Sequence, residues 1–269
     1  MKIKLSAITL SLILVLTCWA EQDHFPSSNA VAEWMMEYYH NPQPNLVSSA
    51  LKTLEEDGVL SANPGAQAPF AGFLSILFQN NPQQTEGWLK QSDAYAGELK
   101  RTIWMGLWLS DTDIGKKCLS EKLKGAHGTD LEYLKILTKN APFNLREMNP
   151  NDPGQLDMLW GAFTASGDPQ YVQRIISVLP LLDQRDDAMK FTIAASAKWS
   201  LKSNSLKHPL VLQTCKSELV NASQALATHL TEIIAEVEGN STNTDDMEKA
   251  VTTLKEDFPK EVTEKYKTK

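Results

Sequence analysis

The sequence predicts an all-α protein of stacked antiparallel helical hairpins, with no sheet and with a solenoid-like arrangement similar to degenerate TPR or HEAT repeats. Three observations favour this fold. Apolar residues recur at helical spacing along most of the chain, for example at Val31, Met35 and Tyr38. No segment of comparable length alternates between apolar and polar residues as a strand does. Prolines that follow a polar residue recur between the apolar segments and are typical of helix starts.

In chain order, the spacing predicts helices near residues 29–40, 45–57, 69–80, 83–91, 94–110, 113–124, 130–139, 154–166, 169–180, 185–203 and 209–238. The polar residue and proline that mark helix starts occur at Asn41-Pro42, Asn81-Pro82, Asp152-Pro153, Asp168-Pro169 and His208-Pro209. Thr129 and Glu132 have the spacing of a capping box, which predicts that Thr129 caps the helix after it. Short turns between successive helices predict hairpins that must stack on neighbours to bury their apolar faces.

Two segments of the chain look alike. Residues 70–77 and residues 156–163 are each an apolar helix that is followed by a proline turn and a second helix. A third segment at residues 106–111 echoes the first half of this unit, but the spacing varies, so any repeat is degenerate.

The chain divides by composition into five parts. We expect a signal peptide over residues 1–20, an N-terminal helical half over 21–139, a loop or hinge over 140–153, a C-terminal helical half over 154–238 and a polar, charged tail over 239–269. The loop is rich in proline and asparagine, which favour turns over helix.

The N-terminus has the order of a signal peptide. Lys2 and Lys4 form a basic start, an apolar run too short to cross a bilayer follows, and small residues end at Ala20. We therefore expect cleavage after Ala20 and a periplasmic or secreted protein. The alternative is lipoprotein processing with a lipid anchor at Cys18, which is disfavoured because the residue before it is not Gly, Ala or Ser.

Charge and hydropathy exclude some classes of function. The formal net charge is −7, and removal of residues 1–20 with their two lysines makes it −9. An acidic chain repels phosphate backbones, so we expect no nucleic-acid partner. No apolar run after the N-terminus is long enough for an integral membrane span.

The segment 159–175 resembles a motif of uncharacterised, exported bacterial helical proteins. The residues that carry the resemblance include Leu159, Trp160, Gly161, Phe163 and Ile175. The resemblance implies a shared helical element and no particular activity.

Two cysteines follow the predicted signal peptide, Cys118 and Cys215. In an oxidising compartment they could form a disulfide, and the alternative is a pair of free buried thiols. A zinc site that combines both cysteines with His127 and His208 is disfavoured because the spacing matches no metal motif. We expect no metal and no cofactor.

Carboxylates could in principle serve hydrolysis, as in a cleft that brings together Asp111, Asp113, Asp186 and Glu132. Helix capping is favoured for Asp111 and Asp113, and for Asp186 with Asp187, because negative charge at a helix start favours the helix dipole. No nucleophile elbow or phosphate loop is present. The sequence therefore indicates no catalytic residues and no enzyme.

Aromatic residues offer the remaining candidate site. Trp104, Trp108 and Trp160 could line a groove between helices, although such side chains are more often core. We expect a non-catalytic scaffold that binds a protein or peptide partner along stacked hairpins. The alternatives are a small-molecule or lipid carrier, which a continuous apolar pocket containing one of these tryptophans would favour, and a helical hydrolase or lyase, which clustered acids would favour.

Overall fold

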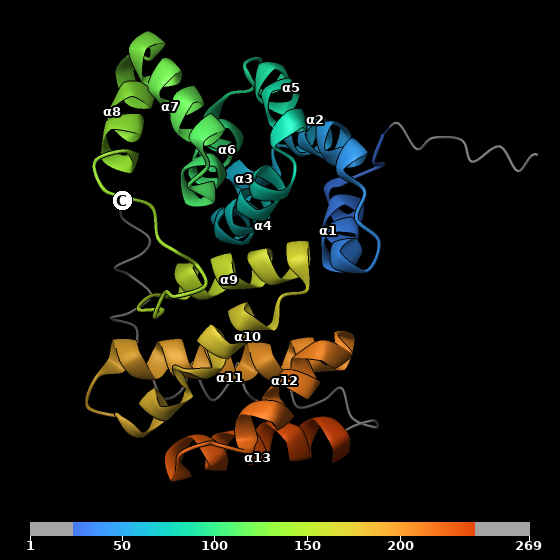
Figure 1. Ribbon diagram of the computed structural model, residues 1–269, viewed down its shortest axis with the longest axis vertical. Helices are drawn as coiled ribbons and strands as arrows, with labels where there is room; N and C mark the ends of the chain where they lie inside the picture. Colours follow the sequence, from blue (N-terminus) through green and yellow to red (C-terminus); the bar gives the residue numbers. More distant parts are fainter. Residues whose placement is uncertain (1–23, 240–269) are drawn as a thin grey trace, which may run out of the picture.

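The computed structural model describes residues 24–239, and the secondary structure of this part of the chain consists of helices, with no strand (Figure 1). The α-helices are α1 (Ser28–Glu37), α2 (Val47–Asp57), α3 (Val59–Ala62), α4 (Gln67–Asn80), α5 (Pro82–Ser92), α6 (Gly97–Ser110), α7 (Asp113–Gly125), α8 (Gly128–Leu137), α9 (Pro153–Ser166), α10 (Pro169–Ile176), α11 (Ala188–Lys207), α12 (Pro209–Leu219) and α13 (Gln224–Gly239). Short 3-10 helices cover Tyr38–His40, Pro44–Leu46, Pro64–Ala66 and Leu179–Asp183. The predicted all-α class is confirmed.

Helices α4 and α9 lie at the centre of the molecule. In Figure 1, α1 to α8 lie on one side of α9 and α10 to α13 lie on the other. Helix α4 packs against both α6 and α9, and every residue of α4 from Phe70 to Phe78 is buried. A helix that is apolar all round is typical of the core.

Two glycines allow α4 and α9 to cross with their backbones in contact. A Cβ atom on Gly161 would lie 1.8 Å from the carbonyl oxygen of Pro69, and one on Gly72 would lie 2.0 Å from the carbonyl oxygen of Met158. Gly161 thus meets Pro69, which is three residues before Gly72, and Gly72 meets Met158, which is three residues before Gly161. Any larger residue at either position would force the two helices apart.

The look-alike segments are these same two helices, and their arrangement does not confirm the solenoid-like detail. Repeats of a solenoid contact their neighbours. Here α4 packs on α9 although α5 to α8 lie between them in the chain. Corresponding pairs also pack in each half: α4 with α6 and α9 with α11, α5 with α7 and α10 with α12, α6 with α8 and α11 with α13. The halves therefore share a packing order and meet face to face.

Local cap signals predicted some helix starts and not others. Asp152 Oδ1 accepts from the Gln155 amide at 3.0 Å, and Asp168 Oδ1 accepts from the Gln170 amide at 2.9 Å, so both predicted caps are confirmed. The pair Asn41-Pro42 starts no helix, because the next helical turn begins at Pro44.

Two further boundary predictions are wrong. Thr129 does not cap α8, which begins at Gly128, and its hydroxyl instead accepts from Arg101 of α6 at 3.2 Å. The helix predicted over 209–238 is broken, since α12 ends at Leu219 and α13 begins at Gln224.

The segment between α8 and α9 contacts both halves. The Trp108 indole N–H donates to the Asn140 carbonyl at 3.2 Å, and the Phe143 ring meets Trp108 edge-on at 5.3 Å between centroids. Arg146 pairs with Asp168 at 3.0 Å on the other side. The chain forms no helix between Leu137 and Pro153, and the role of residues 140–153 as a hinge stays a prediction.

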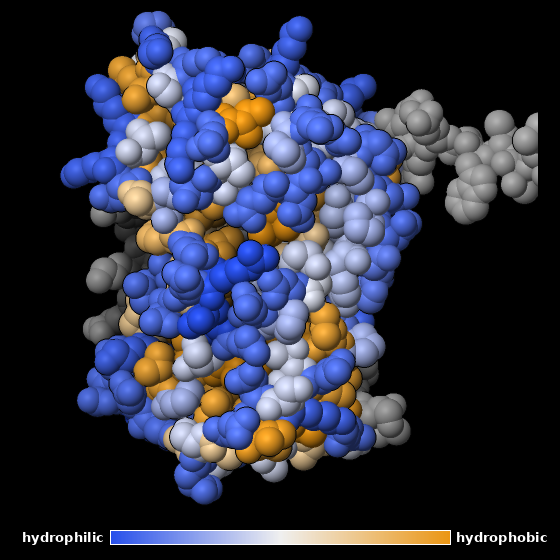
Figure 2. All heavy atoms as spheres, viewed as in Figure 1, coloured by the Kyte–Doolittle hydropathy of each residue, from blue (hydrophilic) through white to orange (hydrophobic). Residues whose placement is uncertain are grey.

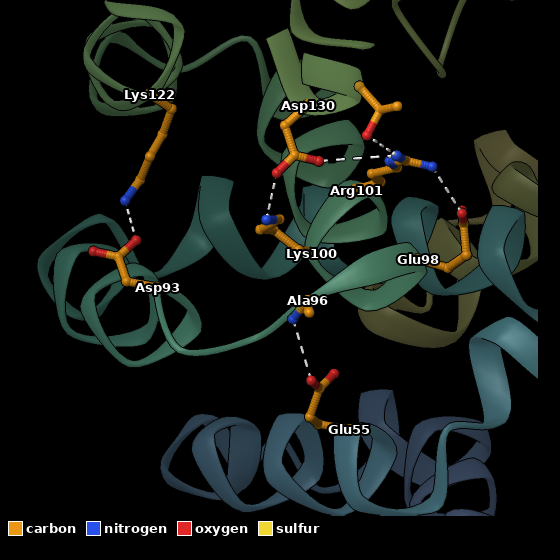
Figure 3. A network of polar contacts seen from close by, with 9 residues as sticks. Glu55, Asp93, Ala96, Glu98, Lys100, Arg101, Lys122 and Asp130 are labelled. Atoms are coloured by element: carbon orange, nitrogen blue, oxygen red, sulfur yellow. Dashed lines mark hydrogen bonds and ion pairs between the residues drawn. The ribbon is translucent and has the colours of Figure 1, made fainter. Parts of the chain in front are cut away.

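A polar network fixes α8 on α6 (Figure 3). Asp130 of α8 pairs with Lys100 at 2.5 Å and with Arg101 at 3.8 Å, and Arg101 also pairs with Glu98 at 2.9 Å. Figure 3 also shows the ion pair of Lys122 with Asp93 and the hydrogen bond from the Ala96 amide to Glu55 at 3.2 Å. These contacts tie α2, α5, α6, α7 and α8 into one body.

Hydrophilic side chains cover most of the face seen in Figure 2, and apolar side chains show between them in separate patches, several over α11 to α13. Within residues 24–239 no helix is both long and apolar enough to span a bilayer. The predicted signal peptide with Cys18, and all of the predicted tail beyond Gly239, lie outside the described residues.

Candidate functional site

An apolar pocket of about 330 Å³ lies against the crossing of α4 and α9. Its walls come from α1, α2, α3, the start of α4 and the middle of α9, with one residue from α11. The apolar side chains that line it include Met35, Met36, Val59, Phe70 and Trp160, and the residue from α11 is Asn204. Exposed Ala32 lies at its rim, so the pocket communicates with solvent.

The corner between α2 and α3 shapes one wall of the pocket. Gly58 ends α2 with φ +61°, a left-handed conformation that glycine adopts without strain, and the chain turns at once into α3. This turn places Val59 and Leu60 of α3 on the pocket. Asp57 accepts from the Ser28 amide at 2.7 Å and so ties the end of α2 to the start of α1.

Helix α1, which forms another wall of the pocket, is fixed by a cluster of aromatic rings. Trp34 meets Tyr38 at 5.2 Å and Phe73 of α4 at 5.4 Å between centroids, and Tyr38 meets Phe73 at 5.2 Å, all three edge-on. Such pairs contribute about 0.5–1.5 kcal/mol each beyond burial. Burial also raises the pKa of Tyr38 to about 12, so its hydroxyl stays neutral.

The polar residues of the pocket are all uncharged. Ser28, Asn29, Asn63, Thr164 and Asn204 supply hydroxyls and amides, and no Asp, Glu, Lys, Arg or His lines the pocket. The indole Nε1 of Trp160 is also polar, and it is buried with no hydrogen-bond partner among the described residues.

Next to the pocket, Tyr39 and His208 join the N-terminal segment to the C-terminal half. His208 follows pocket residue Asn204 by one helical turn, and its Nδ1 lies 3.2 Å from the Tyr39 hydroxyl. His208 is 1% exposed and its Nε2 has no partner among the described residues. Burial lowers the pKa of His208, and nearby His40 and Lys207 add to this while Glu37 opposes it.

We expect this histidine to make the fold less stable in acid. Between the lowered pKa of folded His208 and its ordinary value of about 6.5, the unfolded chain binds a proton that the folded chain does not. Above pH 7 the titration of His208 has no effect on the free energy of unfolding. As the pH falls, it lowers that free energy, by up to about 1.4 kcal/mol at pH 5.5. Asparagine can replace Nδ1 without titrating, so His208→Asn is expected to remove this part of the pH dependence of urea unfolding between pH 7.5 and 5.5. His127→Asn, at an exposed position, is the control and should keep the wild-type pH dependence.

The three tryptophans of the predicted groove have different positions. Trp160 lines the apolar pocket, whereas Trp104 and Trp108 do not. Trp104 is buried, with the Lys100 ammonium 5.4 Å from its ring centroid, and Trp108 is partly covered by the loop before α9. Of the three candidate residues, Trp160 therefore belongs to the apolar pocket, and a groove that includes Trp104 or Trp108 stays a prediction.

The cysteines and histidines do not meet. Cys118 on α7 and Cys215 on α12 are both free thiols, so the disulfide considered for them is not formed. Burial raises the pKa of both, that of Cys215 to about 11. Among residues 24–239 no group of three or more His, Cys, Asp or Glu side chains has the geometry of a metal site.

The candidate acids lie on separate elements. Asp187 caps α11 by accepting from the Lys190 amide at 3.1 Å, so capping is confirmed for this residue. Asp113 lies in the first turn of α7, where its charge favours the helix dipole, but the cap of that helix is Thr112. Asp111 does not start a helix: it ends α6 with φ 51° and pairs with Lys116 at 2.8 Å. Glu132 is on the exposed face of α8, and Asp186 is exposed before α11.

Asp111 also lines a second, polar pocket of about 280 Å³ under the loop before α9. Arg146 lines it too, but its guanidinium already pairs with Asp168. No polar atom that lines this second pocket is both buried and unpaired within the described residues. The apolar pocket is therefore the stronger candidate.

Comparison of the chain with protein-family models, with curated proteins and with solved structures finds no match. The resemblance of residues 159–175 to exported bacterial helical proteins stays a prediction. The function of the chain is therefore inferred from the pocket itself.

Proposed function

We propose that this protein binds a small apolar molecule in the pocket between α1, α3, α4 and α9. The observation that carries the proposal is one continuous, largely apolar cavity that includes Trp160. Its volume of about 330 Å³ falls at the lower end of ligand sites in proteins, which run from roughly 300 to 1,000 Å³.

The lining also has the character of a ligand site. Met35 and Met36 present flexible, polarizable side chains, which adapt to ligands of different shape. Phe70 and Trp160 provide flat aromatic surface, and both are largely buried, so they are held in place by the core around them. A partly open cavity with a rigid floor and an adaptable wall suits reversible binding.

The carrier function is favoured over the two other functions considered from the sequence. A scaffold depends on an extended surface of stacked repeats, and the helices here pack face to face at the crossing of α4 and α9. A hydrolase needs acids that meet in a cleft, and Asp111, Asp186 and Glu132 lie on different elements.

A substitution that fills the pocket tests the proposal. Ala32 is exposed on α1 at the pocket rim, so Ala32→Trp should cover the cavity with little effect on folding. The probe is N-phenyl-1-naphthylamine, an uncharged dye whose fluorescence rises in apolar surroundings. We expect wild-type chain to bind it with saturation and Ala32→Trp to weaken binding at least about tenfold, which corresponds to about 1.4 kcal/mol.

The matched control is Ala235→Trp, which adds the same side chain at an exposed position of α13 outside the pocket. It should bind the dye as the wild type does. Equal affinities of all three chains, or no saturable binding by the wild type, would overturn the proposed function.

A further inference from the structure

We propose that the connection between α1 and α2, residues 38–46, is a pH-sensitive latch that leaves the C-terminal half when His208 is protonated. Tyr39 of this connection contacts that half and packs on His208. The 3-10 helix Tyr38–His40 continues α1, which forms a wall of the apolar pocket, so release of the latch loosens that wall. The movement can be measured without a ligand, so this proposal is independent of the proposed function.

Tyr39 lies between the end of α9 and the start of α12. Its ring meets Phe163 at 5.3 Å and His208 at 5.6 Å between centroids, and its hydroxyl lies 3.2 Å from His208 Nδ1. Helix α9 ends at Gly167 with φ +67°, and a Cβ atom there would lie 2.7 Å from Cδ2 of Tyr39. A residue without a side chain therefore leaves the space in which the Tyr39 ring packs.

The closed latch opposes a positive charge on His208. The side chain is 1% exposed, and its Nε2 has no hydrogen-bond partner among residues 24–239. An imidazolium donates from both ring nitrogens, so protonation would leave a buried cation with a donor that no described residue accepts. When Tyr39 moves away, Nδ1 can bind water, and we expect the ring to take up a proton near its ordinary pKa of about 6.5.

The surroundings of the ring favour its neutral form. Burial contributes most to the lowered pKa of His208, His40 and Lys207 add to it, and Glu37 alone opposes it. Helix α9 presents the uncharged Phe163 edge-on at 5.6 Å, and the first turn of α12 holds no acid. Since the closed latch disfavours the proton and the open latch accepts it, the open population rises as the pH falls below about 6.5.

A single titrating group limits the size of the effect. Above about pH 7 the ring is neutral in both the closed and the open latch, so pH does not change the equilibrium between them. At pH 5.5, one unit below the ordinary pKa, opening is favoured by up to about tenfold relative to pH 7.5. The open latch takes up the same proton as the unfolded chain does.

Hydrogen exchange of the full chain, followed by mass spectrometry, tests the latch. The Asn41 amide donates to the Tyr38 carbonyl at 3.1 Å, and the Leu46 amide donates to the Gln43 carbonyl at 3.1 Å, so these amides report on the connection. After correction for the intrinsic pH dependence of exchange, protection of residues 38–46 should fall about 3- to 10-fold from pH 7.5 to pH 5.5.

Urea at concentrations below the unfolding transition distinguishes local from global opening. Exchange through a local opening exposes little surface and depends weakly on urea, whereas exchange through global unfolding accelerates with it. Exchange of residues 38–46 at pH 5.5 should therefore be unchanged by low urea, while exchange of the buried face of α6 should accelerate.

Two variants assign the pH dependence to His208. His208→Asn should protect residues 38–46 equally at both pH values, and His127→Asn, at an exposed position, should keep the wild-type fall. Tyr39→Phe keeps the ring and loses the hydroxyl, so it should lower protection at both pH values and retain the fall between them. A merely structural role of the contact would not produce this separation.

The remaining outcomes contradict the latch. Unchanged protection of residues 38–46 in the wild type at pH 5.5 overturns it. A fall that grows with low urea assigns the opening to global unfolding and overturns a local movement. A fall that persists in His208→Asn overturns His208 as the group that titrates. Failure of the naphthylamine dye to bind would overturn the proposed function and leave the latch in place.

Discussion

Gly161→Ala is expected to destabilise the fold by more than about 4 kcal/mol and to leave little folded protein. The added Cβ atom would lie 1.8 Å from the Pro69 carbonyl oxygen and 2.8 Å from the Phe73 backbone nitrogen. Both neighbours are backbone atoms in the core, so the clash is relieved only if α9 moves away from α4. That movement opens the close contact between α4 and α9. Urea unfolding followed by circular dichroism measures the loss.

Three other glycines form a graded series with this position. Gly72→Ala meets the Met158 carbonyl oxygen at 2.0 Å and should match Gly161→Ala. Gly106→Ala meets the Leu74 Cβ at 2.8 Å and should cost about 1–3 kcal/mol. Gly87 in α5 has nothing within 4 Å, so Gly87→Ala is the control and should stabilise the chain by about 0.5–1 kcal/mol. If Gly161→Ala behaved like Gly87→Ala, the close crossing of α4 and α9 would be wrong.

Phe73→Ala is expected to destabilise the fold by about 3–5 kcal/mol and also to weaken binding of the naphthylamine dye. Phe73 is 0% exposed and its ring contacts both Trp34 and Tyr38 of the α1 segment. Removal of the ring leaves a cavity and removes the aromatic contacts that hold the α1 segment on α4. Because α1 forms one wall of the pocket, stability and binding should fall together.

Phe143→Ala is the control for Phe73→Ala, because it also removes an aromatic ring but not one that contacts α1. Phe143 is 45% exposed in the loop before α9 and lies edge-on to Trp108. We expect a cost within about 1 kcal/mol and unchanged dye binding. Unfolding curves and dye titrations of both variants give the comparison, and a Phe73→Ala chain that unfolds in urea as Phe143→Ala does would contradict the role given to the aromatic cluster.

The elements of the fold could be predicted wherever the signal was local. Asp152 and Asp168 each accept from an amide two or three residues ahead, so their capping depends on the neighbouring sequence alone. The break before α13 also has a local cause that apolar spacing does not reveal, because the Ser223 hydroxyl accepts from the Leu226 amide as a cap does. Thr129 failed as a cap for a tertiary reason, since its hydroxyl binds Arg101 of α6.

The site could be predicted only in part. Trp160 stood out as an aromatic residue on a helix, and the structure places it in the pocket. Met35 and Val59 gave no such signal, because each is an ordinary apolar residue that becomes part of a site only when α1 and α3 meet α9. The similarity of residues 70–77 to 156–163 was visible, whereas their contact was not. A glycine in a helix permits close approach of another element, as at Gly72 and Gly161, but Gly87 in α5 has nothing within 4 Å, so the sequence alone does not show which glycines lie at a contact.

The reciprocal crossing of Gly72 and Gly161 has the character of an isologous interface, in which one surface meets a second copy of itself across a two-fold axis. Two separate copies of a half-length chain would meet through such a surface as a homodimer. Here the two surfaces belong to one polypeptide, so the association is intramolecular and independent of protein concentration. Helices α1 to α3 precede only the first of the two, since the segment before α9 is a loop. Helices α1 to α3 therefore make the surroundings of α4 differ from those of α9. The apolar pocket lies where these additional helices meet the crossing of α4 and α9.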